Sequence, residues 1–109
     1  MPDIISHLTP EGTPERCGII TKAGKVLELA NVHGDPVLGF RIAPEDIIEH
    51  FEDAEATWHT HPGADPNLSE EDYAGFMQWP DLTHHVAGLR DGKPLVLGFV
   101  VADGILVNL

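Results

Sequence analysis

The sequence predicts an α/β or α+β sandwich, in which one mixed β-sheet is flanked by helices. Its 109 residues, of which 42% are apolar, can fill one hydrophobic core but not two, so we treat residues 1–109 as one domain. Short apolar runs bounded by turn residues occur at both ends of the chain, and two helical segments separated by one strand lie between them. This order favours a mixed sheet over a doubly wound parallel one.

Strands are expected before the first helix. Residues 18–21 and 25–32 are apolar runs separated by the turn signal at 23–24, which predicts a hairpin. After a Gly-Asp-Pro break at 34–36, residues 37–42 are expected to continue as extended chain.

Two helices are expected around a central strand. Pro44 fixes φ at the start of the first helix, and the two acids that follow it face the positive end of the helix dipole. Residues 55–61 form the strand between the helices. The second helix begins at Ser69, and Pro80 prevents it from continuing.

The last third of the chain predicts three strands, at 84–90, 95–101 and 105–109. Asp-Gly pairs at 91–92 and 103–104 separate them. These pairs are typical of tight hairpins, because both turn positions need positive φ.

The charge balance excludes several partners. Six basic residues stand against 18 acidic ones, giving a net charge of −12, so neither nucleic acid nor an anionic membrane surface is expected as a partner. The sequence has no export signal and no apolar run of about 20 residues. The single cysteine cannot form an internal disulfide. We therefore expect a cytoplasmic location, or a particle assembled in the cytoplasm.

One motif carries the chemistry: His59 and His61, followed by Ser69 and Asp72. Residues two apart on a strand point to the same face, so both imidazoles can meet beyond the strand's end. Ser69 and Asp72 lie three apart in the first turn of the next helix, which the intervening Gly/Pro-rich loop can fold back over the strand. The spacing predicts a zinc site with His59, His61 and Asp72 as ligands.

Two histidines and one carboxylate leave a fourth tetrahedral position for water, which is typical of a catalytic zinc site. Ser69 can donate a hydrogen bond to the oxyanion of a tetrahedral intermediate. None of the acids beside the ligands is an obvious proton acceptor. The competing interpretation of Ser69 and Asp72 is a helix N-cap, which needs no metal, and Ser69 can serve both roles.

Other residues near the motif are expected to be structural. Thr60 faces away from the metal side of its strand, and Cys17 is more typical of a small core residue than of a group at the site. The pair at 84–85 has no acid or cysteine at a matching spacing, so packed or solvated imidazoles are expected there. Trp79 is a candidate for lining a groove at the end of the second helix.

The motif resembles that of the JAMM (MPN+) zinc metalloproteases, in which a Glu on an early strand is the general base. The segment 14–20 looks like the family's Glu segment, so the resemblance assigns this role to Glu15. Segments 40–46 and 85–89 resemble JAMM domains of phage tail assembly proteins. The family usually has a longer helix before the Glu than residues 2–14 allow here.

This resemblance implies a fold like that of JAMM and cytidine deaminase domains, and a Zn²⁺-dependent peptidase or isopeptidase with Glu15 and Ser69 as its catalytic residues. It implies a protein or peptide substrate, either a ubiquitin-like β-grasp protein or a phage tail protein, and a host-cytoplasm or virion-tail setting. The alternative is an inactive zinc-binding scaffolding module of a phage tail. A zinc deaminase is not expected, because its cysteine zinc ligands are missing: Cys17 is the only cysteine in the sequence.

Overall fold

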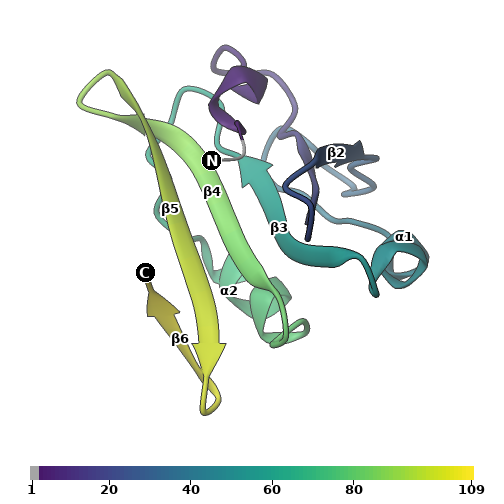
Figure 1. The fold of residues 1–109 in the computed structure, drawn as a ribbon. Helices are drawn as coiled ribbons and strands as arrows, with labels where there is room; N and C mark the ends of the chain where they lie inside the picture. Colours follow the sequence, from purple (N-terminus) through teal and green to yellow (C-terminus); the bar gives the residue numbers. More distant parts are fainter. Residues whose placement is uncertain (1–2) are drawn as a thin grey trace.

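A computed structural model describes residues 3–109, which fold as an α+β domain with a six-stranded mixed sheet and two α-helices (Figure 1). The elements in chain order are a 3₁₀ turn η1 (Ile5–His7), β1 (Cys17–Thr21), β2 (Val26–Leu29), α1 (Pro44–His50), β3 (Ala54–Thr60), α2 (Glu70–Met77), β4 (Thr83–Arg90), β5 (Lys93–Ala102) and β6 (Ile105–Asn108). The strand order is β2-β1-β3-β4-β5-β6. β3 and β4 pair in parallel, and the other neighbouring pairs are antiparallel.

Both α-helices pack on the same face of the sheet, a placement that the expectation of flanking helices left open. On α1, Ile47 packs with Cys17 and neighbouring side chains of β1. On α2, Phe76 packs with Val86 and Phe99, whose strands continue the same face. The helices therefore form one layer, and they leave the opposite face to the N-terminal segment.

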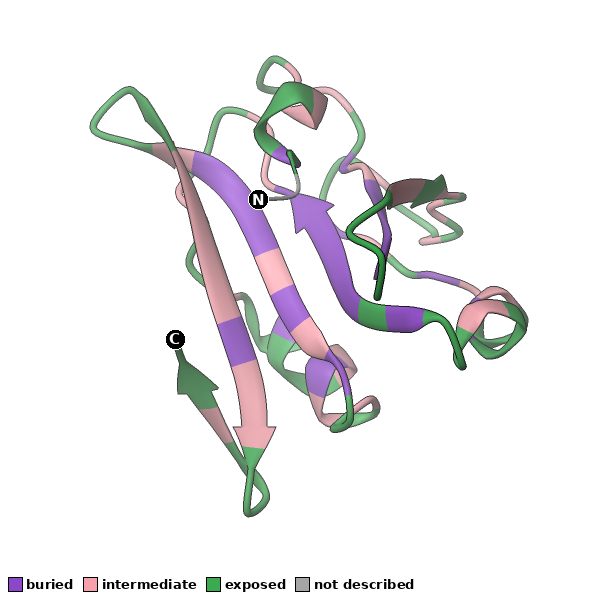
Figure 2. Ribbon diagram, in the orientation of Figure 1, coloured by how far each residue is buried: buried purple, intermediate pink, exposed green. Residues whose placement is uncertain are grey.

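The opposite face is built around Trp58, which is fully buried on β3. The N-terminal segment covers it there, with Ile4 and Leu8 packed against the same cluster. Figure 2 shows β3 buried over most of its length, in agreement with its central position. The helix that the resemblance would place before Glu15 is reduced to the turn η1 in the described residues, and Pro2 lies outside them.

The strand expected at 37–42 is wrong, because this segment is a loop. The backbone N–H groups of Leu38 and Gly39 both donate to the carbonyl of Asp35, which closes a turn instead of extending the chain. The Asn31 side chain hydrogen-bonds with the loop at Gly39 and Arg41, where a strand would need backbone partners. The remaining predicted strands and both helices are confirmed, with strand ends shifted by one or two residues. The exception is the strand predicted at 25–32, which is shorter and spans only Val26–Leu29.

No helix in residues 3–109 has the length and hydrophobicity needed to cross a bilayer.

The close packing of β1, β2 and β3 at Gly18 is testable. The Trp58 indole N–H donates to the Leu27 carbonyl across Gly18, at 3.2 Å, and a Cβ at Gly18 would overlap that carbonyl oxygen. We expect Gly18→Ala to lower the free energy of unfolding by about 3 kcal/mol, measured by urea titration.

Gly75→Ala is the matched control for this substitution. Gly75 lies within α2, and a Cβ there would have no neighbour within 4 Å. We expect this control to raise the free energy of unfolding by about 1 kcal/mol, because alanine has the higher helix propensity. Equal unfolding midpoints for the Gly18 variant and the wild type would contradict the close approach of the three strands.

Candidate metal centre

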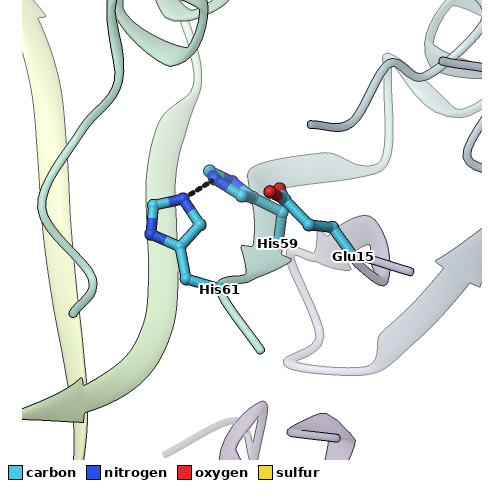
Figure 3. Close-up of side chains that lie close together, drawn as sticks. All are labelled: Glu15, His59 and His61. Atoms are coloured by element: carbon cyan, nitrogen blue, oxygen red, sulfur yellow. Dashed lines mark hydrogen bonds between the residues drawn. The ribbon is translucent and has the colours of Figure 1, made fainter. Parts of the chain in front are cut away.

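Three potential ligand atoms meet at the end of β3. His59 is the penultimate residue of β3 and His61 follows the strand, and their Nε2 atoms lie 3.1 Å apart. Asp72 Oδ2, from the first turn of α2, lies 3.3 Å from His59 Nε2 and 3.0 Å from His61 Nε2. Figure 3 shows the two imidazoles with the Glu15 carboxylate beside them. The structure thus brings together the predicted ligands.

The triangle of these atoms has the dimensions of one face of a zinc tetrahedron. Zinc binds imidazole nitrogen and carboxylate oxygen at about 2.0–2.1 Å, so two ligand atoms of a tetrahedral site lie about 3.3 Å apart. The three distances here run from 3.0 to 3.3 Å. The side chains therefore fit a zinc ion with little rearrangement.

His61 is held in the tautomer that a metal requires. Its Nδ1 lies 2.8 Å from the backbone carbonyl of Asp65, and because a carbonyl only accepts, Nδ1 must carry a proton. In the neutral ring the lone pair is then on Nε2, which faces the centre. The Arg90 guanidinium donates two hydrogen bonds to the Asp65 carboxylate, at 2.9 and 3.0 Å, and so stabilises this loop.

His59 is oriented differently. Its side chain is 0% exposed, and its Nδ1 has no hydrogen-bond partner among residues 3–109. The Phe40 ring stacks on it with centroids 4.0 Å apart, and Phe76 contacts it edge-on at 5.8 Å. Aromatic packing therefore sets the plane of this imidazole.

Asp72 belongs both to the centre and to the helix cap. Ser69 is the N-cap of α2, and its Oγ accepts from the Asp72 N–H at 3.0 Å, while Asp72 Oδ2 accepts from the Ser69 N–H at 3.3 Å. The capping interpretation is thus confirmed, and it places the Asp72 carboxylate beside the histidines. The Ser69 hydroxyl, which accepts in the cap, still has its own proton to donate.

Glu15 lies just before β1, on the same side as the histidines. Its side chain is 8% exposed, and one carboxylate oxygen lies within 4.8 Å of a nitrogen of both His59 and His61. Oε1 has no hydrogen-bond partner among the described residues. Burial raises the pKa of Glu15 to about 7. This carboxylate can therefore accept or release a proton near neutral pH.

The two carboxylates have opposite pKa shifts. Burial also raises the pKa of Asp72, but hydrogen bonds from His59 and His61 outweigh burial and leave this pKa below its usual range. Asp72 is therefore a permanent anion, suited to ligate a cation, whereas Glu15 is suited to carry a proton.

The metal-free centre holds protons where a metal would bind. Burial lowers the pKa of His59. Burial also lowers the pKa of His61, but hydrogen bonds to Asp72 and to the Asp65 carbonyl raise it above its ordinary value. Of the two imidazoles, His61 therefore binds a proton more readily, and a metal ion competes with protons for these nitrogens.

The neighbouring residues have the structural roles expected for them. The Thr60 hydroxyl accepts from the Arg16 N–H at 3.0 Å, which ties β3 to the chain beside Glu15. Cys17 is a buried core residue whose pKa burial raises to about 12, so it is an unreactive thiol. His84 is packed, with Nδ1 2.6 Å from the Thr57 hydroxyl.

A cavity of about 430 Å³ lies beside the centre, between α1 and α2. Phe40 and Phe76 line it, and both rings also contact His59. Trp79 also lines it, as expected from its position at the end of the second helix. The cavity adjoins the centre but contains none of the ligand atoms.

Sequence reasoning missed four residues that support the centre: Asn31, Phe40, Asp65 and Arg90. Asn31 and Phe40 fall in segments predicted as strands, so the sequence pattern did not indicate the contacts that they make in a loop. Asp65 acts through its backbone carbonyl, which any residue could supply, and Arg90 acts through Asp65.

No family model matches this sequence, and neither does a curated protein. Solved structures do resemble it. Protein DSY2949 from Desulfitobacterium hafniense superposes with a TM-score of 0.69 at 18% identity, over 97% of this chain and 82% of that one. A protein from Salinibacter ruber gives a TM-score of 0.50 at 18% identity, over 94% and 81%. At these identities the likeness shows the fold alone, and neither protein is named for an activity.

The raised pKa of Glu15 predicts a pH-dependent cost to folding in metal-free protein. Between pH 4.5 and about 7 the unfolded chain ionises Glu15 while the folded chain keeps it protonated, so stability falls as pH rises through this range. Glu15→Gln removes this dependence. We expect the variant to gain at most about 3 kcal/mol over the wild type from pH 4.5 to 8, measured by urea unfolding with chelator present.

Glu52→Gln is the control, because it makes the same charge change in an exposed side chain. A stability difference between Glu15→Gln and wild type that stays constant with pH would contradict the buried, protonated state of Glu15.

Proposed function

We propose that this protein is a zinc-dependent metallopeptidase or isopeptidase of the JAMM type, with His59, His61 and Asp72 as zinc ligands. One observation carries the proposal: the three ligand atoms lie 3.0 to 3.3 Å apart with a buried carboxylate, Glu15, beside them. This arrangement provides three ligands, an open fourth position and a separate proton acceptor, which hydrolysis at a metal requires.

The chemistry divides between the metal and the chain. When bound, zinc lowers the pKa of a coordinated water toward about 7 and polarises the carbonyl of the substrate. Glu15 accepts a proton at its carboxylate and transfers it to the amine leaving group. Without a metal ion, burial raises the pKa of Glu15 to about 7, so this carboxylate exchanges protons readily at neutral pH.

Ser69 is proposed to steady the oxyanion. Its Oγ accepts from the Asp72 N–H, which fixes the oxygen, and its hydroxyl proton remains available for donation. The side chain is at the surface, where a substrate carbonyl can reach it. One well-placed donor of this kind contributes roughly 3 kcal/mol to transition-state stabilisation.

The finer fold assignment and the substrate class follow from the same resemblance. The structure is an α+β domain with a six-stranded mixed sheet, and within that class we propose a fold of the JAMM and cytidine deaminase kind on the resemblance of the motif alone. We propose a protein substrate, either a ubiquitin-like β-grasp protein or a phage tail protein, cleaved in the cytoplasm of the host or at the virion tail. The net charge of −12 is consistent with a protein rather than a nucleic acid as substrate.

A second candidate function is a zinc-binding scaffolding module without activity. The observation that favours it is the complete capping box formed by Ser69 and Asp72, which gives both residues a structural reason to be present. Glu15 separates the candidates. A scaffold has no use for a buried carboxylate that opposes folding, and Glu15→Gln should leave assembly intact in a scaffold but abolish cleavage in a peptidase.

The zinc ligands can be tested directly by elemental analysis after reconstitution and dialysis. We expect one zinc per chain in wild type and in Glu15→Gln, and none in Asp72→Ala, because two histidines alone hold the ion weakly.

Ser69→Ala is the matched control, because it removes the cap but keeps all three ligands. If both Asp72→Ala and Ser69→Ala lost zinc, the loss would be explained by the broken helix cap and not by the removal of a ligand. A wild-type protein that takes up no zinc would exclude both candidate functions.

A further inference from the structure

His59 lacks the support that metal-binding histidines usually have. Such a histidine normally donates its second ring N–H to a carbonyl or carboxylate, which fixes the ring. His61 does so to the Asp65 carbonyl, at 2.8 Å. His59 Nδ1 has no such partner in residues 3–109, and the side chain is 0% exposed. Another contact must orient this ring.

Phe40 supplies that contact. Its ring stacks on His59 with centroids 4.0 Å apart and an interplanar angle of 20°. Phe40 belongs to the loop between β2 and α1, where no strand or helix holds its backbone. The orientation of His59 therefore depends on how this loop is fixed.

Asn31 fixes the loop on both sides of Phe40. Its Nδ2 donates to the carbonyl of Gly39 at 3.1 Å, and its Oδ1 accepts from the N–H of Arg41 at 3.1 Å. These are the residues immediately before and after Phe40. One side chain thus clamps the backbone that presents the ring.

The same amide also holds Glu15. Asn31 Nδ2 donates to the Glu15 carbonyl at 2.9 Å, and Oδ1 accepts from the His33 N–H at 3.1 Å. All four hydrogen-bonding positions of the amide are occupied. A flipped amide would set oxygen against carbonyls and NH₂ against N–H groups, so its orientation follows from its partners.

We propose that Asn31 is a positioning residue for the metal centre, which holds Glu15 directly and the His59 ring through Phe40. Asn31 thereby helps to orient, through Phe40, an imidazole whose Nδ1 has no hydrogen-bond partner among the described residues, and it couples the proton acceptor to a metal ligand. This inference rests on the proposed function, in which both groups act.

Asn31→Asp tests the proposal with almost no change in shape. The carboxylate keeps an acceptor for the His33 and Arg41 N–H groups, but it sets an oxygen against the carbonyls of Glu15 and Gly39, which repels both. Asn108→Asp is the matched control, because it adds the same charge at an exposed position on β6. Phe40→Leu is the reference that removes the stacked ring itself.

The first readout is the NMR resonances of the His59 ring protons in metal-free protein. The stacked Phe40 ring shifts these resonances, and loss of global stability would not move them in the native state. We expect Asn31→Asp to move them in the direction produced by Phe40→Leu, and Asn108→Asp to leave them in place. Unchanged resonances in Asn31→Asp would overturn the proposal.

The second readout is zinc affinity, measured by competition with a chelator. We expect about a tenfold loss for Asn31→Asp and for Phe40→Leu, with one zinc per chain still bound at saturation. The added negative charge would by itself strengthen cation binding, so a loss reports geometry. If Asn31→Asp does not fold, Phe40→Leu decides, and wild-type affinity in that variant overturns the proposal.

The outcomes also separate this inference from the proposed function. A wild-type protein without zinc would refute the function, whereas zinc binding that both variants leave unchanged would refute only the role of Asn31.

Discussion

The structure depends on three electron-rich side-chain atoms that lie close together in a buried site. The Nε2 atoms of His59 and His61 and the Oδ2 of Asp72 lie within 3.3 Å of one another, and His59 and Asp72 are almost completely buried. Such a group is costly to bury unless positive charge lies among its members. Either a proton, which His61 binds more readily than His59, or a divalent cation can supply that charge.

The fold brings these atoms together by joining two local patterns across one loop. β3 pairs with β1 so that His59 lies directly opposite Cys17, which places Glu15 on the same face two residues earlier. Beyond β3 the chain turns at Gly63 and returns to α2, whose capping box presents Asp72. The loop also packs on β4, where a Cβ at Gly88 would overlap the Ala64 carbonyl. The centre therefore lies where β1, β3 and the start of α2 meet.

Which residues of this centre could be predicted from the sequence depends on whether local patterns or long-range contacts place them. His59 and His61 depend on strand alternation and Asp72 on a helix cap, and both patterns are local. Glu15 depends on the register between β1 and β3, which no local pattern specifies, so only the family resemblance indicated it. The loop at 37–42 contains apolar residues that resemble a strand, but a turn closed on the Asp35 carbonyl and the contacts of the Asn31 side chain hold it in another path.

The face of the sheet on which the helices pack could not be predicted either, because local sequence patterns do not specify it. Amphipathic segments reveal that each helix buries a face, but not which face of the sheet receives it. Both helices lie on the side of His59, and the N-terminal segment, with little regular structure, covers Trp58 on the other. The bare order of elements is compatible with either arrangement.

The two carboxylates of the centre show how one fold separates binding from proton transfer. Asp72 accepts hydrogen bonds from both imidazoles and from the Ser69 N–H, so its charge is compensated in place. Glu15 is held by its backbone, through Asn31 and the Pro36 carbonyl, while its Oε1 has no partner among the described residues. Holding the backbone rather than the carboxylate keeps the proton acceptor in position without lowering its pKa. The hydrogen bonds that Glu15 makes with Asn31 and with the β2–α1 loop therefore hold in place a residue whose buried side chain opposes folding.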